Sequence, residues 1–398
     1  MLKHIPVTEL RLGMYVHELC GLRADHSFWT SSFLLKHESD LQRIRNSSIT
    51  QLWIDGSRGL DIQTVSLSEA PSLTDGQDQT CALEEEIGYA RELCARSKAA
   101  VVRIFSDVRM GRIAELEDMG DLIDDISDSL ARHPDALLSL ARLKTADEYT
   151  YMHSVAVGGL MIALARQLAL PESLVKEAGM AGLLHDVGKL AIPAAILGKP
   201  GKLSDEEFAI VRKHPEIGHQ LLGESKHFSP RVLDVCLHHH ERFDGSGYPD
   251  RLAGSQISLF ARMGAICDVY DAITSDRPYK TCWSPAESIS RMAEWTGHFD
   301  EKIFQAFVKC VGIYPVGSLV RLESGNLGIV MEQNKASLLT PKVKVFYSAL
   351  CKMPIAHTLI DLSTQAGEDR IVSRECAKSW GFKNLDHLWA GSPESVAH

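Results

Sequence analysis

Histidines gather in one stretch of this chain, and they constrain its fold more than any other feature. Eight of the 17 histidines lie between His153 and His240, and three are consecutive at His238–His240. Aspartates accompany them at Asp186 and Asp268. These residues lie on or at the ends of separate expected helices, which a converging bundle can bring to one point. Imidazole and carboxylate groups without thiolates suit Fe, Mn, Co or Ni, and zinc is compatible.

Length and apolar periodicity divide the chain into several parts. Its 398 residues exceed one ordinary domain, and its 45% apolar and 24% charged residues are typical of a globular protein. We expect a mainly α protein whose helical bundle carries a small α+β N-terminal module and a β-rich C-terminal appendage. The expected parts are the α+β module (1–67), a linker (68–80), a connecting helix (81–130), the helical domain that carries the histidines (131–315) and a small β appendage with a tail (316–398).

Several expected elements have clear sequence boundaries. Residues 149–170 form an apolar to amphipathic helix that stops before Pro171, and residues 172–184 form the next. Ser204 with Glu207 three residues later predicts a capping box. Helices are also expected at 230–240 and 259–274. Two β-like runs flank Glu323-Ser324-Gly325-Asn326, which predicts a hairpin. The apolar stripe along residues 83–108 favours packing against the chain's own core over a dimer seam.

Charge and cysteine content exclude several classes of protein. Lys and Arg total 42 against 52 Asp and Glu, and a net charge of −10 disfavours binding to long nucleic acid. The N-terminus lacks the apolar core of a signal peptide. The longest apolar run, residues 155–165, is far shorter than the roughly 20 residues that span a membrane. Nine cysteines without a CxxC pair indicate neither a disulfide framework nor a zinc site. We therefore expect a cytoplasmic protein with no membrane partner.

The adjacent pair His185-Asp186 suits a site for two metal ions. Neighbouring residues at a helix end point about 100° apart, so the carboxylate can bridge two ions while the imidazole binds one of them. The pair His239-His240 could serve the second ion in the same way. The alternative is that each histidine is a surface or capping residue, as most lone histidines are.

A family resemblance emerges from the residues around these pairs. The segments on which the resemblance rests are His185-Asp186-Val187-Gly188-Lys189 and His239-His240-Glu241-Arg242-Phe243-Asp244-Gly245-Ser246-Gly247-Tyr248-Pro249. Together they resemble the HD-GYP domain, a branch of the HD metal-dependent phosphohydrolases whose known members hydrolyse cyclic di-GMP, a bacterial second messenger. The resemblance continues through His214-Pro215-Glu216-Ile217-Gly218, Asp268-Val269-Tyr270-Asp271-Ala272 and Arg277-Pro278-Tyr279-Lys280.

The resemblance implies a ligand set for two divalent ions, with Fe or Mn favoured and Ni, Co or Zn compatible. One ion would be held by His153, His185, Asp186 and Asp268. The other would be held by Asp186, His214, His239 and His240, with Asp186 bridging. His238 matches no ligand position. Two such ions lower the pKa of a bridging water, which gives hydroxide near neutral pH, and neutralise the oxygens of a phosphodiester.

The resemblance also implies residues that contact the substrate or support the site. Asp186 and Lys189 would be catalytic, since Lys189 adds positive charge where the transition state gains negative charge. The expected substrate contacts are Lys189, Tyr248, Arg277 and Lys280, and Tyr248 also offers a flat ring beside a base. The expected supporting residues are Tyr149, Glu241, Asp244 and Asp271.

Two ions are expected rather than three. Some HD-GYP proteins add a third ion through a Glu four residues before the first histidine, and this chain has Tyr149 there. A phenol with a pKa near 10 is a poor ligand at neutral pH. Glu148 lies five residues before His153 and is turned about 100° from Tyr149 on a helix.

The sequence thus predicts a metal-dependent phosphodiesterase that hydrolyses cyclic di-GMP to pGpG or GMP through a metal-bridging hydroxide. Two alternatives stay open: an HD phosphohydrolase for another cyclic dinucleotide, and a non-catalytic sensor of cyclic di-GMP. The N-terminal region resembles a domain of uncertain role that often precedes HD-GYP. A homodimer, and a signalling partner bound through the GYP loop or the N-terminal module, are also left open.

Overall fold

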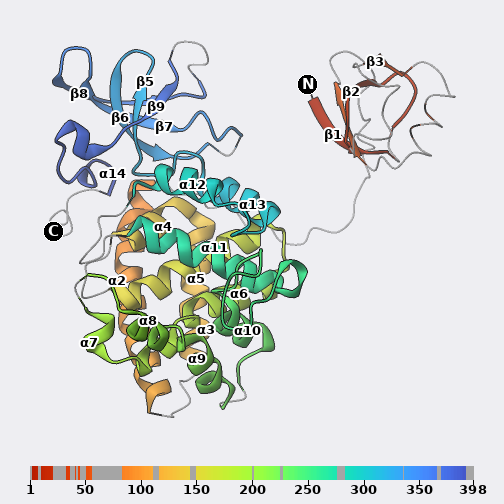
Figure 1. The fold of residues 1–398 in the computed structure, drawn as a ribbon. Helices are drawn as coiled ribbons and strands as arrows, with labels where there is room; N and C mark the ends of the chain where they lie inside the picture. The colour runs from red at the N-terminus through yellow and green to blue at the C-terminus, as the bar shows by residue number, and fades with distance from the viewer. Residues whose placement is uncertain are drawn as a thin grey trace. The chain divides into compact units, whose positions relative to one another are not determined.

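The fold is mainly helical with a five-stranded antiparallel sheet near the C-terminus, so the predicted fold class is confirmed (Figure 1). The computed structural model describes residues 2–7, 10–20, 33–35, 41, 44, 51–55, 83–110, 116–143, 149–199, 201–224, 227–275, 283–334, 336–364 and 369–390. The chain divides into two compact units, Met1–Gln77 and Asp78–His398. The predicted linker at residues 68–80 lies outside the described residues.

The first unit contains a small antiparallel sheet. Strands β1 (Leu2–Pro6), β2 (Tyr15–Cys20), β3 (Phe33–Leu34) and β4 (Gln51–Asp55) pair in the order β1-β4-β2-β3. Its buried apolar side chains are Val7, Leu10, Met14, Val16, Leu35, Leu41 and Ile44. This cluster is separate from the core of the second unit, so the described part of the unit has a core of its own.

The second unit is a helical bundle followed by a sheet. Its helices are α2 (Leu83–Arg109), α3 (Leu116–Arg132), α4 (Pro134–Arg142), α5 (Tyr149–Gln167), α6 (Glu172–Leu184), α7 (Ala194–Leu197), α8 (Asp205–Val211), α9 (His214–Gly223), α10 (Pro230–His238), α11 (Leu259–Thr274), α12 (Pro285–Glu294), α13 (Glu301–Val311) and α14 (His387–Ala390). The capping box at Ser204 is confirmed. No described helix has the length and apolar character that crossing a membrane requires.

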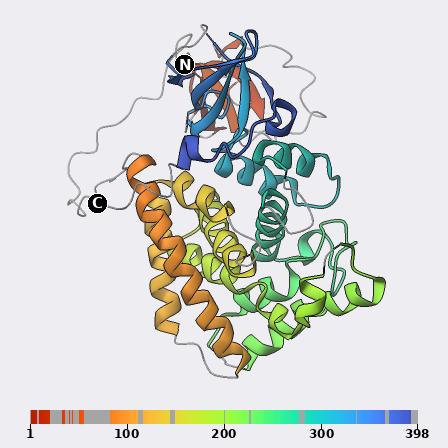
Figure 2. The same ribbon diagram turned by 90° about the vertical axis from the view of Figure 1, so that its left-hand side faces the viewer.

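Helix α5 is the centre of the bundle. It contacts α2, α3, α4, α6, α11 and α13, and Val155, Val157, Met161 and Leu164 are fully or almost fully buried. A helix that is apolar on all sides must be covered on all sides, which explains the apolar run in the sequence. The long helix α2, orange in Figure 2, packs its apolar stripe into the same core. The stripe therefore packs inside the chain, as expected.

Glycines let α5 and α6 approach each other closely. A Cβ atom on Gly182 would lie 2.8 Å from the carbonyl oxygen of Val157 and 2.9 Å from the Cα of Gly158. Because no side chain separates the two backbones, the start of α5 lies beside the end of α6. The rings of His153 and His185 are consequently 5.1 Å apart between centroids.

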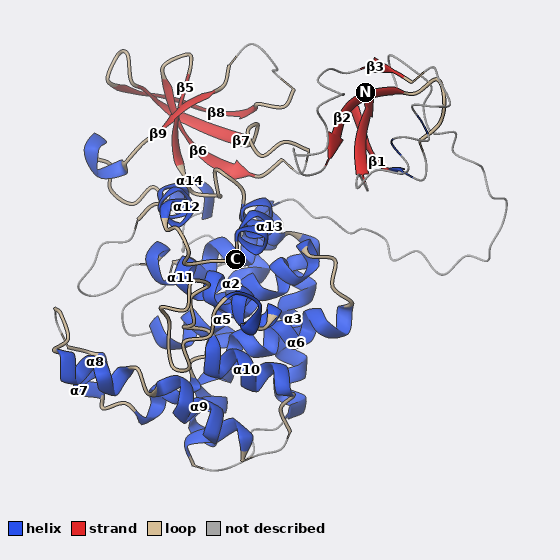
Figure 3. Cartoon of the chain, turned by 45° about the vertical axis from the view of Figure 1, so that its right-hand side comes forward, coloured by secondary structure: helices blue, strands red, loops and turns tan. Residues whose placement is uncertain are grey.

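The C-terminal sheet packs against the bundle. Its strands are β5 (Leu319–Leu322), β6 (Asn326–Glu332), β7 (Lys342–Ser348), β8 (Met353–Asp361) and β9 (Ile371–Arg374), in the order β8-β7-β6-β5-β9 (Figure 3). The predicted hairpin is confirmed as β5 and β6, with Val320 opposite Gly328. Arg142 of α4 donates to the carbonyl oxygen of Val316 at 3.0 Å, which joins bundle and sheet.

We predict that Gly182→Ala destabilises the protein, because the added methyl group would collide with the backbone of α5. Overpacking of this kind reduces the free energy of unfolding by about 1–3 kcal/mol. The control is Gly120→Ala in α3, where nothing lies within 4 Å of the new Cβ. It should stabilise by about 0.5–1 kcal/mol. Urea unfolding of both variants checks this, and equal stability of the two would contradict the close approach.

Candidate metal centre

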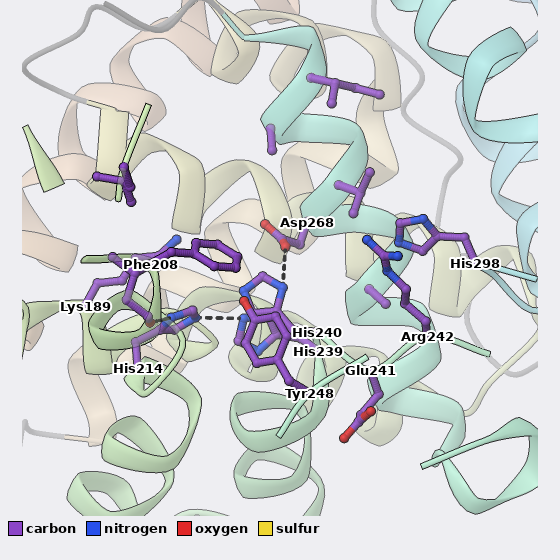
Figure 4. Close-up of a pocket in the computed structure, with 16 residues that line it drawn as sticks. Lys189, Phe208, His214, His239, His240, Glu241, Arg242, Tyr248, Asp268 and His298 are labelled. Atoms are coloured by element: carbon purple, nitrogen blue, oxygen red, sulfur yellow. Dashed lines mark hydrogen bonds and ion pairs between the residues drawn. The ribbon is translucent and has the colours of Figure 1, made fainter. Parts of the chain in front are cut away.

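Side chains from three helices (α5, α9 and α11) and from the C-terminal ends of two others (α6 and α10) converge in two groups of ligand type. The first group is His153, His185 and Asp268, and the second is Asp186, His214, His239 and His240. Within each group, one nitrogen or oxygen atom from every residue lies within 4.8 Å of all the others. Figure 4 shows His214, His239, His240 and Asp268 around the adjoining cavity. The structure thus brings together all seven residues that the sequence analysis named as ligands.

Asp186 lies between the two groups. Its Oδ2 is 3.5 Å from His153 Nε2 and 3.3 Å from His185 Nε2. Its Oδ1 is 3.2 Å from His214 Nε2 and 3.7 Å from His239 Nε2. Each carboxylate oxygen therefore faces one group, which is the arrangement that a bridging ligand requires.

Hydrogen bonds from the outer ring nitrogens orient four of the histidines. A carbonyl oxygen can only accept, so the Nδ1 atom that contacts it carries the proton, and Nε2 is left to face the centre. The Nδ1 donors and their acceptors are His185 to Gly182 O at 2.7 Å, His214 to Val211 O at 2.7 Å, His239 to Val235 O at 3.0 Å and His153 to the Asp271 carboxylate at 2.6 Å. Histidines that bind metals are held in this way.

The inward-facing atoms fit divalent cations. His214 Nε2 and His239 Nε2 lie 3.3 Å apart, although Nδ1 hydrogen bonding leaves both with lone pairs. His185 Nε2 and Asp186 Oδ1 are buried and make no hydrogen bond with any described residue. Lone pairs facing one another in a buried site repel unless positive charge lies between them. The nitrogen and oxygen donors, without a thiolate, match Fe, Mn and related divalent ions.

The electrostatics of the centre favour the protonation states of metal ligands. Burial raises the pKa of Asp186, but the charges of Lys189 and His185 outweigh it and lower this pKa well below its ordinary value. Burial lowers the pKa of His240 to about 3, so this imidazole is neutral. Burial also opposes charge on His185, but Asp186 raises the pKa of His185 to about 10. A proton on His185 is therefore a competitor that a metal ion must displace.

A cavity of about 490 Å³ opens beside the centre. Lys189 lines it, and its ammonium group contacts Asp186 Oδ2. Tyr248 also lines it, and its ring is stacked on His240 with centroids 4.8 Å apart. The guanidinium carbon of Arg212 lies 4.4 Å from the centroid of Tyr248. Because His240 and Arg212 both pack on the Tyr248 ring, its edge and hydroxyl group are the parts that we expect to meet a ligand.

The loop after α10 is held by carboxylates that the sequence analysis assigned to support. Glu241 Oε1 accepts from the backbone N–H of Asp250 at 2.7 Å, and Asp244 Oδ1 accepts from that of Ser246 at 2.9 Å. His238 lies between Asp234, at 2.7 Å from Nδ1, and Asp250, at 3.0 Å from Nε2. His238 belongs to neither ligand group.

Some expected site residues cannot be placed. Arg277 and Lys280 lie outside the described residues, as does Glu148, and the side chain of Tyr149 is not described although α5 begins there. The sequence analysis in turn missed lining residues of the cavity, namely Phe208, Arg242 and His298. Arg242 follows the expected ligands His239 and His240 closely, so its position was a usable signal.

The helical bundle and the candidate metal centre together define this chain as an HD-domain protein. The profile of the HD domain matches residues 126–303, and that of a domain of unknown function, DUF3391, matches residues 2–119. The second match extends beyond the expected module of residues 1–67 and across α2.

One relative over the whole length and two over part of it narrow the class to a family of phosphodiesterases. A cyclic di-GMP phosphodiesterase of Pseudomonas aeruginosa is 59% identical over 403 residues, which is 100% of this chain and 97% of that protein. A cyclic di-GMP phosphodiesterase response regulator of Xanthomonas campestris is 41% identical over 43% of this chain and 47% of its own length. A 3'3'-cGAMP-specific phosphodiesterase of Vibrio cholerae is 42% identical over 37% of this chain and 28% of its own length. The chain belongs to the family of HD-domain cyclic di-GMP phosphodiesterases.

We predict that Asp271→Asn weakens metal binding about 10- to 100-fold, because the carboxylate that holds the His153 ring and its Nδ1 proton is lost. The control is Asp234→Asn. Asp234 accepts from His238 in the same geometry, but His238 belongs to neither ligand group. Titration of the metal-free protein with Mn²⁺ measures both variants. Equal affinity of Asp271→Asn and the wild type would contradict a positioning role for Asp271.

Proposed function

We propose that this chain is a metal-dependent phosphodiesterase that hydrolyses cyclic di-GMP to pGpG or GMP. The observation that carries the proposal is the position of Asp186 between two groups of ligand-type residues, beside a cavity that can hold part of a nucleotide. Whole-length similarity to a protein named as such a phosphodiesterase supports the choice of substrate.

The centre holds two divalent ions in this proposal, with Fe or Mn favoured. His153, His185 and Asp268 would hold one ion, and His214, His239 and His240 the other, with Asp186 shared. Bound divalent ions supply Lewis acidity toward the phosphate and lower the pKa of bound water. The carboxylates and the neutral imidazole of His240 are already in the states that bind such ions, and a bound ion would displace the proton of His185.

The chain's own residues orient the substrate and balance its charge. Lys189 lines the cavity at Asp186, so its ammonium group lies where a phosphodiester gains negative charge during cleavage. Tyr248 presents its hydroxyl group, and burial raises the pKa of this phenol, so it donates a hydrogen bond while staying neutral. Arg277 and Lys280 supply further positive charge for phosphate or guanine.

One experiment distinguishes the proposed function from its two alternatives, which are hydrolysis of another cyclic dinucleotide and binding of cyclic di-GMP without turnover. The similarity to a 3'3'-cGAMP-specific phosphodiesterase favours testing a mixed cyclic dinucleotide, and an intact ligand set disfavours a sensor without turnover. Protein purified without oxygen and loaded with Mn²⁺ or Fe²⁺ is given each dinucleotide, and products are separated by chromatography. Faster cleavage of cyclic di-GMP supports the proposal, and binding without cleavage would establish the sensor instead.

A cytoplasmic location, a homodimer and a signalling partner at the GYP loop or the N-terminal module stay predictions from the sequence.

We predict that Asp186→Ala abolishes hydrolysis and metal retention together, because both groups lose their shared carboxylate. Metal analysis should return two ions per chain for the wild type and a clear deficit for the variant. Asp121→Ala, at an exposed position of α3, is the control and should match the wild type. Near-normal turnover by folded Asp186→Ala protein would exclude the two-metal proposal. Three tightly bound ions per wild-type chain would contradict the expected number of two metal ions.

We predict that Arg277→Ala and Lys280→Ala raise KM for cyclic di-GMP about 10- to 100-fold while the metal content is kept, because each loses a hydrogen bond to a charged group of the substrate. Lys176→Ala is the control, since this exposed lysine pairs with Asp124 on the outside of the bundle. Steady-state kinetics with metal analysis measure the effect. An unchanged KM in both variants would mean that the pair is only a solvated surface.

A further inference from the structure

An exposed aromatic ring forms part of the cavity wall. Phe208 lies on α8 with 49% of its surface exposed, and it lines the cavity beside the metal centre. Figure 4 shows its ring pointing over the histidines. Single exposed apolar side chains are common on protein surfaces. Ile210 on the same helix is one, at 38% exposed, but it does not line the cavity.

Helix α8 is a well-fixed support for this ring. Ser204 and Glu207 form a capping box at its start, and the Glu207 carboxylate also binds Lys199 Nζ at 2.6 Å. At its end, the carbonyl oxygen of Val211 accepts from Nδ1 of His214. The helix that carries Phe208 therefore also orients a proposed metal ligand, so ring and centre are held in a fixed relation.

Phe208 differs from the other aromatic side chain at the cavity. The Tyr248 ring is stacked on His240 and also has the Arg212 guanidinium over it, so less of its surface is open to a base. Arg212 lies 6.0 Å from the Phe208 centroid and 4.4 Å from that of Tyr248, so it packs on Tyr248. Among the described lining residues, Phe208 offers the exposed ring.

Two arginines bring positive charge to the cavity. Arg242 is exposed and lines it. Arg212 is half-buried, and its guanidinium carbon lies within 6.0 Å of the ring centroids of two lining residues, Phe208 and Tyr248. Neither guanidinium forms an ion pair with any acidic side chain that the structure describes. A cyclic dinucleotide has two phosphodiesters and two flat bases. When one phosphodiester lies at the metal centre, the other and the bases must meet the walls.

We propose that Phe208 is the platform on which a purine base of the substrate stacks, and that Arg212 and Arg242 balance the charge of the phosphodiester that is not cleaved. This inference rests on the proposed function and adds binding residues to it. Stacking on an aromatic ring tolerates different bases, because every base has a flat face. The platform therefore strengthens the binding of a dinucleotide, and discrimination between guanine and adenine falls to polar groups elsewhere.

The test compares Phe208→Ala, Phe208→Leu and Phe208→Tyr in the full-length, metal-loaded protein. Loss of a base–aromatic stack should raise KM for cyclic di-GMP about 5- to 150-fold in Phe208→Ala. Values of kcat and metal content should stay near those of the wild type. Phe208→Tyr should restore KM, and Phe208→Leu should not, because leucine fills space without a flat ring. Ile210→Ala is the control on the same helix and should leave KM unchanged.

Arg242→Gln tests the charge separately and should raise KM while making it less sensitive to salt. A wild-type KM in Phe208→Ala, or full rescue by leucine, would overturn the platform. A fall in kcat alone would also overturn it, because the ring would then act on the chemical step. If the wild type fails to cleave cyclic di-GMP, the proposed function is wrong, and calorimetric binding of cyclic di-GMP to the same variants still decides whether Phe208 stacks a base.

Discussion

The rest of the helical domain depends on one constraint: the buried carboxylate of Asp186 needs positive charge around it. Asp186 is 1% exposed, and an ionised group removed from water is strongly destabilising unless cations or hydrogen bonds surround it. Lys189, three residues further along the chain, supplies one charge. A proton on His185 supplies another, but the inward-facing nitrogens of neutral histidines such as His240 supply none. The divalent ions of the proposed function would meet the need of both groups at once, and metal binding would then contribute to the stability of this domain as well as to its chemistry.

The bundle satisfies that requirement through its helix ends. Carbonyl groups at or near a C-terminus lack partners within the helix, and here several of them accept from Nδ1 of a histidine. Gly182 accepts from His185 and Val211 accepts from His214, while Val235 accepts from both the backbone N–H and Nδ1 of His239. The same bonds satisfy the backbone and orient the imidazoles, so local helix geometry and ligand geometry are set together.

The cavity wall is formed by elements that contribute different chemical groups. The loop after α10 is tied down by Glu241 and His238, and it presents the edge of Tyr248. Helix α8 presents the face of Phe208. Because the charges of Lys189 and Arg242 lie along the same cavity, the wall suits a ligand that is both flat and anionic. A cyclic dinucleotide has both properties.

The sequence alone determined the helix boundaries and the ligand pair that depend on residues close together in the chain. Pro171 and the Ser204 capping box mark helix boundaries, and the adjacency of His185 and Asp186 indicated a shared carboxylate, because these signals act within a turn or two. Only the tertiary structure decided which oxygen of Asp186 faces which histidines, and that Phe208 lines the cavity. Both depend on how closely helices approach one another, which for α5 and α6 is set by glycines without side chains. A local pattern gives the face of a helix but not the distance to its neighbour.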